Sequence, residues 1–142
     1  MTTPALSLDL AQRVVTAALD AAAAERVPIA AVVVDPAGRV VAGARMDGVP
    51  WVNWDVAARK AAAAAVFGAP THVVRAMADE DPVLVTALAA TDGEVLAVPG
   101  GFPVVVDGAP VGGLGLAGGH YLQDQQIGEK ALAGPTGVEE SR

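Results

Sequence analysis

Residues 100–130 read GGFPVVVDGAPVGGLGLAGGHYLQDQQIGEK, and this stretch decides the fold class of the chain. Two apolar runs, 103–106 and 111–116, flank the turn dipeptide Asp107-Gly108, a pattern that predicts an antiparallel hairpin. A helix is predicted directly after it, over residues 122–132. The hairpin therefore delivers His120, Tyr121 and Asp124 to the start of a helix, where we expect the functional site.

The second strand of this hairpin has little side-chain bulk, because it contains Gly112, Gly113 and Gly115. Glycine inside a strand weakens it and usually marks a bulge or a place where a ligand or another backbone comes close. We predict that Gly113 and Gly115 line a ligand site. Tight packing of a helix or of a second subunit on the strand is the alternative explanation.

The rest of the chain supplies further helices and strands around this hairpin. Ser7 is placed to cap a first helix that ends near Arg26, and Pro28 separates that helix from the first strand. Asn53, Thr71 and Asp79 are candidate caps for later helices. The predicted helices cover 8–26, 53–67, 71–78 and 82–90, and the predicted strands cover 29–35, 39–45 and 94–98. With the hairpin, this order predicts an α+β domain around one five-stranded, largely antiparallel sheet flanked by helices.

Length and composition indicate a single domain that associates with itself. The 142 residues are 53% hydrophobic but only 4% aromatic, with a mean hydropathy of +0.45. A core of small side chains must pack closely, and apolar surface that one domain cannot bury favours a homo-oligomer, a dimer or larger. We expect residues 6–133 to form the core and residues 134–142 to be a mobile tail.

The net charge of -7 and a pI near 4.6 argue against nucleic acid and anionic membranes as partners. No apolar run approaches the roughly 20 residues of a membrane span, and the N-terminus lacks the pattern of a secretory signal, so we expect a cytoplasmic protein. The absence of cysteine excludes disulfides and thiolate metal sites. No His, Asp or Glu spacing matches a structural metal site, and none is predicted.

Four segments together resemble the GlcG/HbpS family of haem-degrading-domain proteins, a domain also found fused to cobalamin adenosyltransferases. They are VPIAAVVVDPAGRVVAGARMDG (27–48), ARKA (58–61), PGGFPVVVDGAPVGGLGLAGG (99–119) and QDQQIGEKAL (123–132). The resemblance covers about residues 6–133. It implies a profilin-like α/β/α fold, assembly into dimers or higher oligomers and, for some members, haem binding or degradation. It implies function less firmly than fold, because one fold can host unrelated sites.

His120, at a helix start beside the glycine strand, is the first candidate for chemistry. A helix N-terminus favours neutral imidazole, which suits a haem-iron ligand, a general base or a hydrogen-bond donor. A structural role in capping the helix or bridging subunits is the alternative. Asp124 is a candidate to orient His120, although its spacing favours an ordinary capping contact. His72, at a short helix start, is predicted to be a surface residue.

Lys60 lies on an alanine-rich helix and is a candidate to pair with a haem propionate or a substrate carboxylate, or else to reach solvent over a buried stem. The family pattern places Arg45 and Asp47 near the site, where they are predicted to bind ligand; a solvated turn is the alternative. Trp54 and Tyr121, with Trp51, are candidates to line a flat ligand or an interface, and exposed tryptophan favours the interface.

Two functions are compatible with these residues, and the sequence does not decide whether the protein is an enzyme. The first is haem binding, with haem degradation as its extension; a pocket of Ala, Val and Gly, however, suits a smaller ligand. The second is acid/base chemistry by His120 on a small anionic substrate in the same pocket, with Lys60 or Arg45 as the anion-binding group. A non-enzymatic accessory protein is a third reading.

Overall fold

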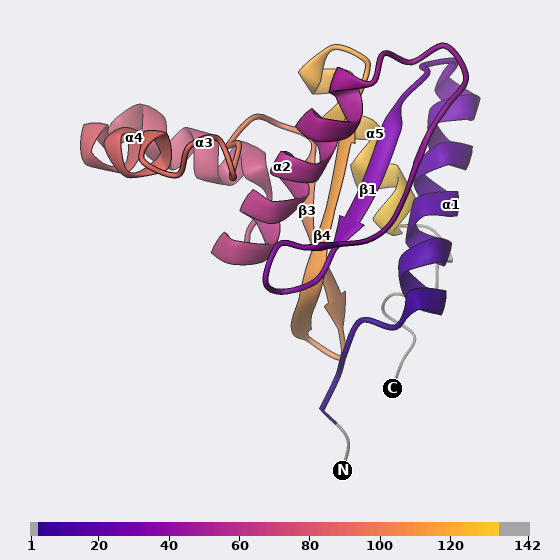
Figure 1. Ribbon diagram of the computed structural model, residues 1–142, viewed down its shortest axis with the longest axis horizontal. Coiled ribbons are helices and arrows are strands. Elements are labelled where there is room, and N and C mark those ends of the chain that lie inside the picture. The colour runs from indigo at the N-terminus through magenta and orange to yellow at the C-terminus, as the bar shows by residue number, and fades with distance from the viewer. Residues whose placement is uncertain (1–2, 134–142) are drawn as a thin grey trace.

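A four-stranded antiparallel sheet lies between two helical layers in the computed structural model, which describes residues 3–133 (Figure 1). The strand order is β2-β1-β4-β3. The strands are β1 (Ala30–Val34), β2 (Val40–Arg45), β3 (Gly101–Val106) and β4 (Ala109–Ala117). The predicted α+β class and α/β/α layering are confirmed.

The register of the sheet brings several strand ends together. Ala30, the first residue of β1, pairs with Arg45 of β2 on one side and with Ala117 of β4 on the other. Arg45 and Ala117 therefore lie at the same end of the sheet. They are separated by two strand spacings, or roughly 10 Å. The β4–α5 turn starts from this end.

Helices α1 (Leu8–Glu25) and α5 (Tyr121–Ala133) pack together on one face of the sheet. Ser7 caps α1 as predicted, because its Oγ accepts the N–H of Leu10 at 3.0 Å. Ala31 and Val33 of β1 face these helices, whereas Val32 faces the opposite layer. Burial of both faces explains why β1 is a continuous apolar run and does not alternate.

Helix α2 (Val52–Phe67) forms the opposite layer and lies directly on the glycine strand. A Cβ added at Gly113 would lie 2.2 Å from the carbonyl oxygen of Ala61, and one added at Gly115 would lie 1.8 Å from that of Ala57. No side chain fits at either position. The two glycines thus allow the helix backbone to approach the strand backbone closely.

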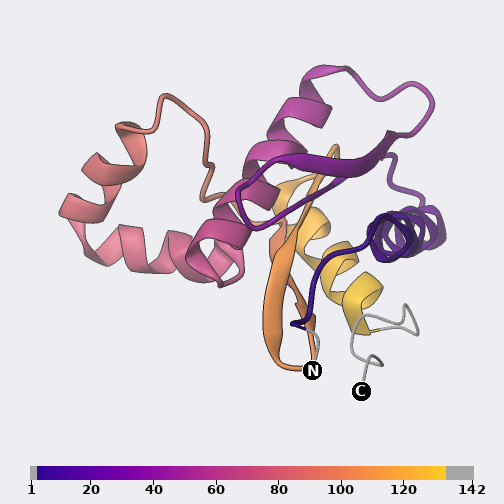
Figure 2. The ribbon, with the colours of Figure 1, turned by 60° about the horizontal axis from the view of Figure 1, so that its bottom comes forward.

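Helices α3 (Thr71–Glu80) and α4 (Pro82–Ala89) leave the body as an arm that points away from α1 and α5 (Figures 1 and 2). Asp81 caps α4 by accepting the N–H of Val83 at 3.0 Å. None of the residues of α4 is buried, although the helix reads PVLVTALA and carries no charge. We refer to α3 and α4 together as the arm, and to the sheet with α1, α2 and α5 as the body.

The predicted strand over 94–98 is wrong, so the sheet has four strands and not five. The backbone of this segment bonds to helices and not to a neighbouring strand. The N–H of Leu96 donates to the carbonyl of Arg59 in α2 at 3.2 Å, and the hydroxyl of Thr71 donates to the carbonyl of Val98 at 2.6 Å. The Arg59 side chain holds the segment further by donating to the carbonyl of Gly93 at 2.7 Å.

Three predicted helix caps are also wrong. Trp51, and not Asn53, precedes α2, and it makes no side-chain capping bond. Thr71 is the first residue of α3, and its hydroxyl accepts the N–H of Gly101 at 2.8 Å. Asp81 replaces Asp79 as the cap of α4. The predicted mobile tail, residues 134–142, lies outside the described residues.

Candidate functional site

A buried ion pair joins two of the predicted site residues. The Nζ of Lys60 lies 3.2 Å from the Oδ2 of Asp124, and the two side chains are only 3% and 2% exposed. Lys60 also donates to the carbonyl of Leu116 at 2.8 Å, while the Oδ1 of Asp124 accepts the N–H of Gly119 at 3.1 Å. Both charges are thus hydrogen-bonded beyond their mutual contact, as buried charges require.

This pair connects the two helical layers around the start of β3. Lys60 belongs to α2 and Asp124 to α5, and these helices pack on opposite faces of the sheet. Gly100 lies beside them with φ of +120°. A Cβ at Gly100 would lie 2.9 Å from the Lys60 Nζ and 3.1 Å from the Asp124 Cβ, so the ion pair takes the space of a side chain.

Burial dominates the electrostatics of the pair. Desolvation lowers the pKa of Lys60 below its ordinary value, and the attraction and hydrogen bond of Asp124 oppose that shift. Desolvation likewise raises the pKa of Asp124, opposed first by Lys60 and then by the Gly119 N–H. The Lys60 side chain is enclosed, and its ammonium contacts the end of β4 and the Asp124 carboxylate of α5.

His120 lies at the surface and caps α5. Its Nδ1 accepts the N–H of Leu122 at 3.2 Å, and its backbone N–H donates to the Oε1 of Gln123 at 2.9 Å. The ring packs on Tyr121 with centroids 4.1 Å apart. Because Nδ1 is an acceptor, a neutral ring carries its proton on Nε2 and presents a hydrogen-bond donor to solvent. Iron coordination through Nε2 would require the ring to protonate at Nδ1 and give up the cap.

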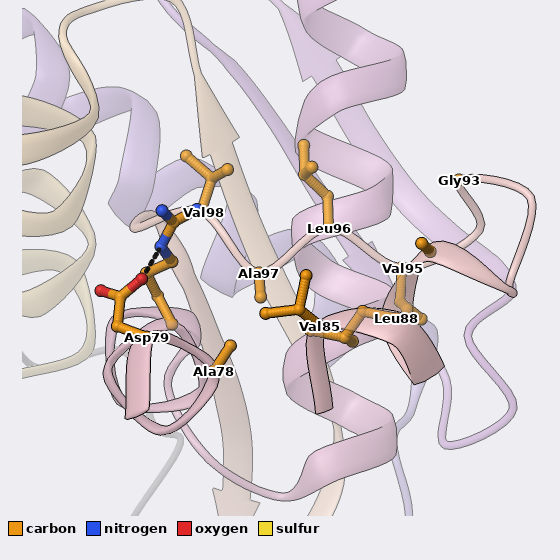
Figure 3. Close-up of a pocket in the computed structure, with 11 residues that line it drawn as sticks. Ala78, Asp79, Val85, Leu88, Gly93, Val95, Leu96, Ala97 and Val98 are labelled. Carbon is orange, nitrogen blue, oxygen red and sulfur yellow. Dashed lines mark hydrogen bonds and ion pairs between the residues drawn. The ribbon is translucent and has the colours of Figure 1, made fainter. Parts of the chain in front are cut away.

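Two adjoining hollows lie between the body and the arm. The first, of about 460 Å³, is lined by Arg75, Asp79, Val98, Pro99 and Tyr121, and we call it the Tyr121 hollow. The second, of about 360 Å³, shares Arg75, Asp79 and Val98 with the first (Figure 3). Its further walls are the apolar side chains of α4 and of the 93–98 segment, and we call it the α4 hollow. The remaining lining residues are Ala78, Val85, Leu88, Ala89, Gly93, Val95, Leu96 and Ala97.

Arg75 lies where the two hollows meet. Its Nε donates to the Oδ1 of Asp79 at 3.0 Å, one turn further along α3. The two side chains are 57% and 59% exposed, so solvent screens the attraction between them. Little free energy is therefore lost when the Arg75 guanidinium leaves Asp79 for another carboxylate. The Arg75–Asp79 spacing of four residues was the only sequence signal for this place, and it is a common one on helix surfaces.

The structure does not bring all predicted site residues together. Gly113 and Gly115 lie beneath α2. Arg45 donates to the carbonyl of Val49 at 2.5 Å, and Asp47 is exposed in the turn between them. Trp54 packs against Gly43 of β2. Strand β2 is the edge opposite β3, about 14 Å away across three strand spacings. Only His120 and Tyr121, with Lys60 and Asp124 behind them, lie near the hollows.

Within residues 3–133, no group of three or more His, Asp or Glu side chains is arranged to hold a metal ion. The helices over the same residues include none that is long and apolar enough to cross a membrane. The lining of the two hollows combines apolar walls with the Arg75–Asp79 ion pair and the Tyr121 ring.

Comparison with known proteins defines the family. The model of the family described as haem degrading protein, HbpS-like, matches residues 6–133. The chain therefore belongs to the HbpS-like haem-degrading protein family, as the sequence motifs predicted.

Relatives with names or structures share the whole domain. The corrinoid adenosyltransferase PduO of Salmonella typhimurium is 31% identical over 133 residues, which is 93% of this chain but only 40% of that relative. A solved PduOC:heme complex is 30% identical, with a TM-score of 0.82, over 92% of this chain and 94% of the other. A double mutant of HbpS from Streptomyces reticuli is 30% identical, with a TM-score of 0.81, over 94% of this chain and 88% of the other. A second HbpS structure is 29% identical, with a TM-score of 0.81, over 94% of this chain and 92% of the other.

Proposed function

We propose that this protein binds haem in the two adjoining hollows between the body and the arm. Membership of a haem-degrading family and the existence of a haem complex of a 30% identical relative support the choice of ligand. The proposed location rests on one observation: two apolar hollows meet at Arg75, beside the stacked rings of Tyr121 and His120.

The residues present fit a flat apolar ligand that carries carboxylates. Val85, Leu88 and Leu96 supply an apolar wall, which favours a macrocycle over water. Arg75 is placed to exchange its exposed partner Asp79 for a propionate, an exchange that a planar guanidinium favours. Tyr121 offers an aromatic surface for stacking. Haem, when bound, would supply the redox-active iron that haem degradation requires.

His120 acts as a hydrogen-bond donor in the orientation that the structure has. Its Nδ1 is occupied by the Leu122 N–H, so its outward Nε2–H suits a propionate oxygen better than an iron ion. Loss of this donor is expected to weaken haem binding without changing the iron ligation.

Titration with haemin, followed by the Soret band, tests the proposal. Saturation near one haem per subunit is expected, with affinity about tenfold weaker in Arg75→Gln, since charge-assisted bonds contribute about 1.5–3 kcal/mol. Arg13→Gln is the matched control, because Arg13 also pairs with an aspartate four residues away, Asp9, on an exposed helix face. His120→Ala is compared with His72→Ala, although His72 is not the surface residue that the sequence predicts: it is half-buried and packs edge-on against Phe102. Binding that does not saturate, or haemin affinities that are equal in all four variants, would contradict the proposal and turn attention to small carboxylates.

The arm also supports the predicted homo-oligomer. Val83, which lines neither hollow, is 76% exposed on a helix with no buried residue. An apolar helix of eight residues is too short to be stable without tertiary packing. An uncharged apolar face is self-complementary, so a second copy of the chain is the partner that we propose for it.

A further inference from the structure

The Lys60–Asp124 pair joins α2, the end of β4 and the β4–α5 turn beside the proposed site. Lys60 donates from α2 to the last residues of β4 through the carbonyl of Leu116. Asp124 accepts from Gly119, in the turn that links β4 to α5. His120 and Tyr121 follow Gly119 directly, so their positions depend on this turn.

The turn itself has little intrinsic rigidity. Gly118 has φ of +142°, and Gly119 follows it, so two glycines in succession leave the backbone freer than any other residue would. A Cβ at Gly118 would lie 2.5 Å from the carbonyl oxygen of Pro28, which limits the turn on one side. On the other side two side chains of α5 hold it: the Asp124 carboxylate accepts the Gly119 N–H, and Gln123 Oε1 accepts the His120 N–H.

We propose that Lys60 and Asp124 are positioning residues for the His120–Tyr121 pair, and that their charges fix the turn and are not needed for the stability of the body. The proposal rests on the proposed haem site. A buried ion pair is weak support for stability, because desolvation of the two charges offsets their attraction. It does, however, hold one geometry, since the carboxylate uses both oxygens in fixed directions.

Two double variants separate positioning from stability. Lys60→Met/Asp124→Leu removes both charges and the acceptor for Gly119, while it keeps apolar volume. Lys60→Met/Asp124→Asn also removes both charges but keeps a side-chain carbonyl that can accept from Gly119. The first variant is expected to melt at or above the wild-type temperature. The second variant is the conservative one, because its asparagine is expected to restore the bond to the Gly119 N–H without a charge.

Two readouts follow the turn without haem. Hydrogen exchange of the Gly119 amide is expected to accelerate at least about tenfold in the Leu variant and to recover most of its protection in the Asn variant. The ¹⁵N signals of the His120 ring are expected to lose the pattern of an accepting Nδ1 in the Leu variant alone. A third readout, haemin affinity, is expected to fall roughly tenfold or more in the Leu variant and to recover in the Asn variant.

The outcomes distinguish the two proposals. If wild-type protein fails to bind haemin but the exchange and ring signals change as stated, the haem proposal fails and the positioning proposal stands. If the folded Leu variant keeps wild-type exchange at Gly119 and wild-type ring signals, the positioning proposal is overturned whatever haemin does. The positioning proposal is also overturned if the haemin affinity of the Leu variant falls only as much as the fraction of unfolded protein explains.

Discussion

The body and the arm are built on opposite principles. In the body, α2 lies so close to β4 that Gly113 and Gly115 have no room for a side chain, and an ion pair is enclosed between the layers. In the arm, α4 has no buried residue at all. The two hollows lie where these regions meet.

The difference shows how a chain of small residues obtains both a stable fold and a binding surface. The body buries backbone against backbone, which small side chains permit and which leaves little tolerance for change. In the arm, Val74 of α3 is buried, but α4 leaves its larger apolar side chains at least partly exposed, and these are the side chains proposed to meet a ligand or a second subunit. Substitutions should therefore affect stability in the body and association in the arm.

Gly115→Ala is expected to give the largest effect. Its new Cβ would lie 1.8 Å from the carbonyl oxygen of Ala57, so α2 must move away from the sheet. We expect a loss of about 4 kcal/mol or more in the free energy of unfolding, measured by urea denaturation. Gly48→Ala is the control: it meets no atom within 4 Å and costs only about 1 kcal/mol for its φ of +80°. Equal losses would mean that close packing is not what Gly115 provides.

Lys60→Met is expected to cost about 3 kcal/mol at pH 7, because it leaves the Asp124 carboxylate buried and unpaired. Lys130→Met, which breaks an exposed pair with Glu25, should cost less than about 1 kcal/mol. Chemical denaturation of both variants checks the contrast. A small loss in Lys60→Met would show that the body relaxes around the charge.

The loss in Lys60→Met should depend on pH. Without Lys60, burial raises the pKa of Asp124 further above its ordinary 3.8, so the native state binds more protons than the unfolded state between those two values. Stability relative to wild type is therefore recovered as the pH falls through the native pKa of Asp124, and recovery is complete below about 3.8. Denaturation curves from pH 7 to pH 4 follow this recovery. A loss that stays constant or grows on acidification would contradict the burial of an unpaired carboxyl.

Val83→Asp is expected to have the smallest effect on stability and a clear effect on association. Val83 is 76% exposed, so the free energy of unfolding of the subunit should change by no more than about 0.5 kcal/mol. The mass measured by light scattering should fall if α4 packs against a second copy. Val66→Asp, at a 60% exposed position of α2, is the control that should keep the mass. Unchanged mass in Val83→Asp would exclude the arm as the interface.

The sequence predicted the helices and hairpins well, including the arm, where the predicted helices 71–78 and 82–90 agree with α3 and α4 within two residues; it failed in the segment between α4 and β3. Turn dipeptides and apolar runs are local signals, and they placed α1 and both hairpins within one or two residues. The segment over 94–98 has the composition of a strand, but its backbone partners, Arg59 and Thr71, lie in helices far away in the sequence.

The site was harder to predict than the fold, because its contacts are long-range. Lys60 and Asp124 were both singled out, yet nothing in the sequence shows that residues 64 positions apart form one buried pair. Arg75 was not singled out, since a charged pair one helical turn apart is usually a solvated face. The apolar walls of the hollows belong to α4 and the 93–98 segment, which only the tertiary structure brings together.

The most direct test of the haem site is to map bound haemin by its paramagnetic broadening of backbone amide signals. The account predicts that signals of Arg75, Val98 and Tyr121 disappear, since these residues line the Tyr121 hollow. Signals of the Asp107-Gly108 turn, at the far end of β3 and roughly 20 Å away, should persist. Broadening centred on Arg45 and Trp54 at the opposite edge of the sheet, with the hollow unaffected, would contradict the account.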